Sequence, residues 1–181
     1  MKNKFEKKND KHYNTDIDNK HINDSLELYT LKKNVSNNRS IIIAVVILTA
    51  VNVIFILSKV NIIFPISLIF PTVVLKAADF LANRYSITNL VPIVLALIVV
   101  YILFYIFLYR ASKKSSAAAL TALILISLDA VTFVWYTIAM NDINVYLIFN
   151  IVFYAWVLVT IFRLFDDMVK IKQYIRRTEG K

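Results

Sequence analysis

The sequence predicts an all-α membrane protein with four transmembrane helices, one external interfacial amphipathic helix and a disordered, basic N-terminal tail. Hydrophobic residues make up 59% of the 181 residues, against about half in an average soluble chain. They form runs of about 18 to 24 residues, the length at which a helix crosses a hydrocarbon layer of ~30 Å. All the Lys and Arg residues except Arg163 lie outside these runs.

The N-terminal segment, residues 1–40, is dominated by Asn, Lys and Asp and has no apolar cluster. Such a segment buries too little apolar surface to order itself, so the sequence predicts a disordered cytoplasmic tail. Asp24 and Glu27 have capping-box spacing ahead of Leu28 and Leu31. This spacing allows one short helix within the tail, and the alternative is a simple solvated lead-in.

Residues 41–181 form the predicted membrane domain, whose crossings cover residues 41–58, 90–109, 117–140 and 145–165. Small residues recur every four positions at the start of the third crossing, as in the pair Ala118 and Ala122, which lets a neighbouring helix approach closely. In the fourth crossing, Arg163 precedes Asp166 and Asp167 by three and four residues. This spacing indicates that the helix continues into the cytoplasm.

Residues 61–88 differ from the crossings and are predicted to lie in the outer interface. From Thr72 onwards, polar residues recur at steps of three and four, which places them on one helical face. Pro71 fits the first helical position, where its missing N–H has no consequence. An amphipathic helix of this kind lies in the plane of the membrane surface rather than across it.

The number of crossings depends on whether residues 61–82 also cross the membrane. A fifth crossing would divide the Lys and Arg residues almost evenly between the two sides. With four crossings, only Lys59, Lys76 and Arg84 lie outside and all the others lie inside, which the positive-inside rule favours. The sequence therefore predicts four crossings with both termini in the cytoplasm.

One carboxylate, that of Asp129, is predicted at mid-membrane, where it is disfavoured by about 2.5–3.5 kcal/mol on insertion scales. It should face inward, with Asn52, Tyr101, Tyr105 and Tyr154 at similar depths. Two interpretations are open: an acid that binds a ligand or couples transport to protons, and a buried hydrogen bond that sets the helix register. The lack of a second charged residue at this depth favours the structural interpretation.

The predicted outer helix is the better candidate for recognition, because the bundle itself offers few polar groups. Its candidate recognition residues are Lys76, Asp79, Phe80, Asn83 and Arg84. The alternative is an amphipathic helix that only anchors the chain to the bilayer surface.

Composition excludes several classes of chemistry. The chain has no Cys and a single Gly, so thiol nucleophiles, thiolate metal sites and glycine-rich phosphate loops are excluded. Both histidines, His12 and His21, lie in the polar tail. We expect no catalytic residues, no metal, no cofactor and no enzymatic activity. The net charge of +9 is explained by the cytoplasmic segments and anionic headgroups, so we expect no nucleic-acid binding.

The part of the chain from Ile41 to Lys172 resembles a family of small, uncharacterised four-helix integral membrane proteins of bacteria. The resemblance is carried by Phe64-Pro65, Phe70-Pro71, Leu128-Asp129-Ala130 and Tyr154-Ala155-Trp156-Val157-Leu158. It implies the same topology in a bacterial cytoplasmic membrane, and it implies no activity.

These observations predict a non-enzymatic accessory, sensor or immunity-type protein. It would bind another membrane component or a toxin through residues 61–89, with the lipid bilayer as its constant partner. A homo-oligomer is compatible with this interpretation. The alternative is an oligomeric small transporter or channel that uses Asp129.

Overall fold

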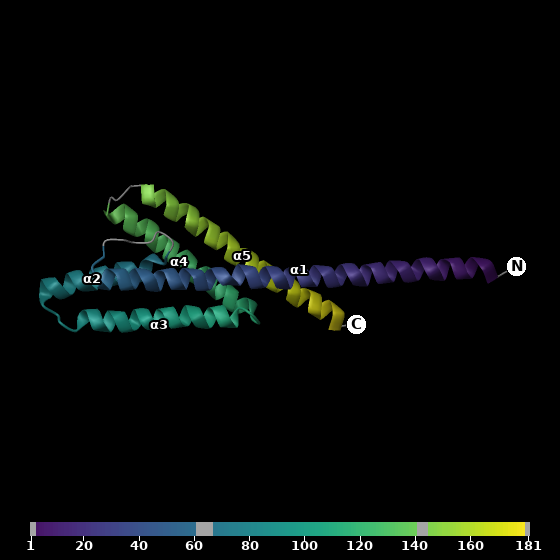
Figure 1. Cartoon of the computed structure of the whole chain (residues 1–181), viewed down its shortest axis with the longest axis horizontal. Helices are drawn as coiled ribbons and strands as arrows, with labels where there is room; N and C mark the ends of the chain where they lie inside the picture. The colour runs from purple at the N-terminus through teal and green to yellow at the C-terminus, as the bar shows by residue number, and fades with distance from the viewer. Residues whose placement is uncertain (1–2, 61–66, 141–144, 180–181) are drawn as a thin grey trace.

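The computed structural model describes residues 3–60, 67–140 and 145–179, and the side chains within 24–60, 67–139 and 147–178. In these ranges the regular structure consists of five α-helices. They are α1 (Asn3–Leu57), α2 (Ile69–Tyr85), α3 (Leu90–Ala111), α4 (Ser116–Met140) and α5 (Val145–Glu179). Figure 1 shows α2 and α3 alongside the C-terminal part of α1, while α4 and α5 cross it obliquely.

Four of these helices, α1, α3, α4 and α5, contain segments long and apolar enough to cross a membrane. This result confirms the predicted number of such segments. The last three predicted crossings begin within one residue of the first residues of α3, α4 and α5. The α5 helix also continues to Glu179, well past the predicted end of its crossing.

Residues 3–40 differ from the expected disordered tail, because α1 runs through them as one continuous helix. A membrane-spanning helix supplies the costly nucleus, after which each added residue gains one hydrogen bond. No Pro or Gly interrupts this segment. Val35 is buried in the same cluster as Met168 of α5, so the part of α1 next to the bundle is also held by tertiary contacts. Figure 1 shows the N-terminal part of α1 projecting beyond the other helices.

The main core lies between α1, α3, α4 and α5. At its centre, Ala119 and Ala122 of α4 are completely buried, together with Tyr105 of α3 and Ile161 of α5. Two alanines one turn apart leave room for a neighbouring backbone to approach α4, as the spacing of small residues in the sequence predicts.

A second, smaller core cluster joins α2 to the C-terminal end of α1 and the N-terminal part of α3. It consists of Val53, Leu75, Ala78, Val94 and Ile98. The side of α2 that packs inward therefore carries Leu75 and Ala78, one turn apart. Thr72, which the periodicity places on the polar face, is also buried, whereas Phe80 and Tyr85 are exposed. The interfacial position of this helix stays a prediction.

Two residues with left-handed backbone end helices in this part of the fold. Lys59 (φ 56°) follows α1, and Ser86 (φ 54°) follows α2. The N–H groups of Val60 and Ile87 then bond back to Phe55 and Ala82, as in the Schellman motif. Glycine normally takes this conformation, but the single glycine of the chain lies elsewhere.

Substitution of Ala119 by Leu should lower the stability of the bundle by about 1–3 kcal/mol, because a larger side chain cannot enter this contact without displacing a neighbouring helix. Thermal unfolding in mild detergent measures the effect. Ala139→Leu, at an exposed position of the same helix, is the matched control and should change stability by less than about 0.5 kcal/mol. Equal stability of the two variants would contradict this packing.

Candidate functional site

The Asp129 carboxylate binds the N-terminus of α2. Its Oδ2 accepts a hydrogen bond from the backbone N–H of Ile69 at 2.9 Å, and its Oδ1 accepts one from Phe70 at 2.9 Å. The Asp129 side chain is almost completely buried, with 2% of its surface exposed. Both oxygens therefore act as acceptors for the first two N–H groups of a helix, which have no partner within the helix itself.

The local sequence explains why α2 needs this partner. The residue before the helix, Leu68, has extended backbone and offers no side-chain cap. Asp is among the best N-cap residues because its oxygens accept these hydrogen bonds and its charge suits the positive end of the helix. Here the carboxylate comes from another helix, 60 residues further along the chain. Pro71 is the third residue of α2 rather than the predicted first, still within the turn that tolerates proline.

Tyr154 of α5 completes the coordination of Asp129. Its hydroxyl lies 2.5 Å from Oδ2 and also within 3.2 Å of the Ile69 nitrogen and the Ser67 carbonyl oxygen. The ring of Tyr154 stacks on Phe133 of α4, with centroids 5.5 Å apart. This packing holds the hydroxyl where it bridges α4, α5 and the start of α2.

The helix α1 binds the same short segment from the other side. Thr49 Oγ1 accepts a hydrogen bond from the Leu68 N–H at 3.0 Å, and Asn52 Nδ2 donates to Ser67 Oγ at 2.5 Å. Thr49 and Asn52 are both fully buried. Residues 67–70 are thus held by polar groups of α1, α4 and α5 together.

Tyr101 and Tyr105 lie beside this cluster rather than in it. Their hydroxyl oxygens are 3.3 Å apart, and the Tyr101 ring is 5.7 Å from the ring of Phe70. The structure therefore brings the predicted polar residues together in two groups. Asp129, Asn52 and Tyr154 surround residues 67–70, and the tyrosine pair packs next to them. Thr49 and Ser67, which belong to the cluster, are missing from the predicted set.

The geometry favours the structural interpretation of Asp129. Its oxygens accept hydrogen bonds from three donors, which are two backbone N–H groups of α2 and the Tyr154 hydroxyl. In a bilayer centred on the crossings, this site lies near mid-depth, where an unsatisfied backbone N–H is most costly. The carboxylate thus offsets the free-energy cost of burying the N-terminal N–H groups of α2. These N–H groups in turn offset the cost of burying the carboxylate.

The starting depth of α2 determines where its other end lies. Its 17 residues span about 25 Å, more than half of a ~30 Å hydrocarbon layer. The helix therefore runs from the level of Asp129 to the end of the bundle at which α1 ends and α3 begins. The part from residue 76 to residue 85 is called the outer half of α2 below.

The outer half of α2 carries the five residues predicted for recognition, and the side chains of Lys76, Asp79, Phe80, Asn83 and Arg84 are all exposed. The Arg84 guanidinium carbon lies 5.8 Å from the ring centroids of both Phe80 and Tyr85. These distances are in the range of cation–π contacts. Residues 61–66 of the predicted recognition segment lie outside the described residues.

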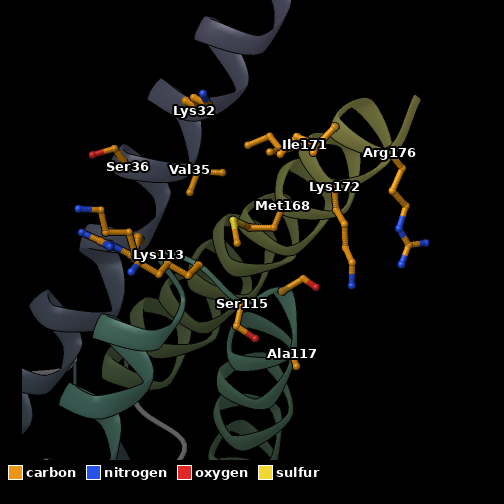
Figure 2. Close-up of a pocket in the computed structure, with 14 residues that line it drawn as sticks. Lys32, Val35, Ser36, Lys113, Ser115, Ala117, Met168, Ile171, Lys172 and Arg176 are labelled. Atoms are coloured by element: carbon orange, nitrogen blue, oxygen red, sulfur yellow. The ribbon is translucent and has the colours of Figure 1, made fainter. Parts of the chain in front are cut away.

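A cleft at the opposite end of the bundle was not predicted. It has a volume of about 820 Å³ and lies between α1, the α3–α4 turn and α5. Figure 2 shows Lys32 of α1, Lys113 of the turn and Lys172 of α5 at this cleft. We call it the basic cleft. The basic turn and the basic end of α5 are visible in the sequence, but the third wall depends on a segment expected to be disordered.

Within the described residues, no group of three or more His, Asp or Glu side chains is placed to hold a metal ion. Comparisons with protein-family models, curated proteins and solved structures found no match. The resemblance to four-helix bacterial membrane proteins therefore stays a prediction.

Replacing Asp129 by Asn should destabilise the fold by about 2–3 kcal/mol, because the Asn side chain keeps one acceptor oxygen and its NH2 group cannot accept the second of the N–H groups of Ile69 and Phe70. Tyr154→Phe should have a smaller effect of about 1–2 kcal/mol, since it removes one donor. Unfolding in mild detergent gives the stability, and hydrogen exchange at residues 69 and 70 reports the bonds directly. Asp79→Asn, an exposed change on the same helix, is the control. Unchanged exchange in Asp129→Asn would contradict the capping role.

Proposed function

We propose that the protein is a non-enzymatic integral membrane protein of the bacterial cytoplasmic membrane, acting as an accessory, sensor or immunity-type factor. It would bind another membrane component or a toxin through the outer half of α2. The observation that carries the proposal is the contrast within α2. Residues 67–70, where it begins, are bound by three helices, whereas Phe80 and Tyr85 in its outer half are 59% and 62% exposed.

The composition of the outer half of α2 supports binding to a protein. Aromatic and Arg side chains are enriched in the energetically important parts of protein interfaces, and here Phe80, Arg84 and Tyr85 lie together. Lys76 and Asp79 are exposed beside them. The start of α2 is held in place by hydrogen bonds. This favours a higher affinity, because the helix loses little conformational freedom on binding.

The distribution of charge supports an orientation with both termini in the cytoplasm. Figure 1 shows the C-terminal end of α5 and the turn between α3 and α4 at the same end of the bundle as the N-terminal part of α1. The basic cleft lies at this end. By the positive-inside rule this end is cytoplasmic, so the outer half of α2 lies at the external interface.

Phe80→Asp should remove partner binding while the protein still inserts, because the substitution places a charge at the centre of the exposed aromatic group without touching either core cluster. Affinity capture from membranes of the native host measures binding, and protection assays apply where a neighbouring gene encodes a toxin.

Leu57→Asp is the matched control, since Leu57 is also an exposed apolar residue at the outer end of the bundle, but on α1. We expect the control to capture the same partner as the wild type. Undiminished capture by a well-inserted Phe80→Asp variant would refute this proposal.

The alternative function, a small transporter or channel that uses Asp129, is less well supported. A transported proton or ligand would have to displace the N–H groups of Ile69 and Phe70 from the carboxylate. We therefore expect liposomes containing the purified protein to show no ion or proton flux above that of empty liposomes. Flux that is present in the wild type and lost in Asp129→Asn would establish the alternative.

A further inference from the structure

The basic cleft is rich in positive charge and distant from the outer half of α2. Six of its lining residues are basic: Lys32, Arg39, Lys113, Lys114, Lys172 and Arg176. None of its lining residues is acidic. Among the described side chains, the ion pair found on α5 joins Lys170 to Asp166, and neither of these residues lines the cleft. The six cations thus have no described carboxylate as an ion-pair partner.

Two further features of the cleft favour an anion. The Arg39 Nε is buried and has no hydrogen-bond partner among the described residues, while the guanidinium carbon lies 4.5 Å from the ring centroid of Tyr109. Ser116 and Ala117, which begin α4, also line the cleft. The first N–H groups of a helix have no acceptor in that helix and favour an anion at its positive end.

The cleft also has apolar walls. Val35 of α1, Met168 and Ile171 of α5, and Ala117 of α4 line it together with the basic residues. Val35 and Met168 are part of the main core cluster, and Ile171 packs against it. In the view of Figure 2, Met168 lies between Lys113 and Lys172. A ligand that suits this cleft therefore combines a negative group with an apolar body.

The position of the cleft along the bundle further restricts the class of ligand. Its walls include the turn that follows α3 and the first residues of α4, which is where the crossings meet the cytoplasmic surface. Phosphate groups of lipids lie at this level, directly next to their acyl chains. The volume of about 820 Å³ falls within the range of roughly 300–1,000 Å³ typical of small-molecule sites.

From these observations we propose that the basic cleft binds the phosphate-bearing headgroup of an anionic phospholipid. The phosphate is held by the basic side chains and the N-terminus of α4, and the start of an acyl chain contacts Val35 and Met168. Because the site couples α1, α4 and α5, an occupied cleft also fixes the cytoplasmic part of α1 against the bundle. This inference does not depend on the function proposed for the outer half of α2.

Native mass spectrometry of the purified full-length chain in non-ionic detergent tests the proposal. The chain is titrated with phosphatidylglycerol and, separately, with phosphatidylcholine, and the fraction that retains lipid is measured. We expect phosphatidylglycerol to bind at least tenfold more tightly. Lys113→Gln combined with Arg176→Gln should weaken its binding about thirtyfold, given the contribution of each basic residue near a headgroup. Both side chains are exposed, so their replacement leaves the fold intact.

Arg110→Gln combined with Arg177→Gln is the matched control. It removes two charges from the ends of α3 and α5, next to the tested positions but outside the cleft, and should weaken binding less than twofold. The charge-conserving pair Lys113→Arg and Arg176→Lys should bind like the wild type.

Two outcomes would overturn the proposal. Equal weakening by the cleft pair and the control pair would mean that the lipid responds only to the overall charge of the cytoplasmic surface. Displacement of phosphatidylglycerol by an equal concentration of glycerol 3-phosphate would mean that the cleft recognises a soluble phosphate compound and not a lipid. Retention of the lipid in the presence of glycerol 3-phosphate supports the lipid as the source of the phosphate.

Discussion

Two backbone hydrogen bonds, from the N–H groups of Ile69 and Phe70 to the carboxylate of Asp129, set the position of α2 in this protein. A helix that starts inside a bilayer exposes donors that no lipid can satisfy, and a buried carboxylate is equally unfavourable when alone. Each group therefore stabilises the other. Thr49, Asn52 and Tyr154 add bonds from two more helices, so the start of α2 is tied to three of the four crossings.

This arrangement separates the polar contacts at the centre of the bundle from charged and aromatic groups exposed at its two ends. Asp129 has its hydrogen-bond donors within the chain. At one end, the outer half of α2 presents Phe80, Arg84 and Tyr85. At the other end, the continuation of α1 meets the α3–α4 turn and α5 around the basic cleft. The recognition surfaces that we propose therefore lie at the ends of the bundle, and the contacts of Asp129 lie at its centre.

The candidate site was partly predictable. Depth along each crossing can be counted from the sequence, and this count placed Asp129, Asn52 and Tyr154 at one level, where the structure brings them around residues 67–70. The groups that bind Asp129 most directly are backbone N–H groups, which leave no mark in an amino-acid pattern. The periodicity of α2 distinguished a polar face from an apolar face. It did not show which side of the helix packs on α1 and α3, because that depends on the neighbouring helices.

The sequence by itself determined the four membrane-length helices and the limits of α3 and α4, because run length and hydropathy are local properties that a bilayer acts on directly. It also predicted the continuation of α5 beyond its crossing. Tertiary structure alone decided that α2 begins beside Asp129 and that six basic residues from three segments line one cleft. These features depend on contacts between residues far apart in the chain, which no local pattern encodes.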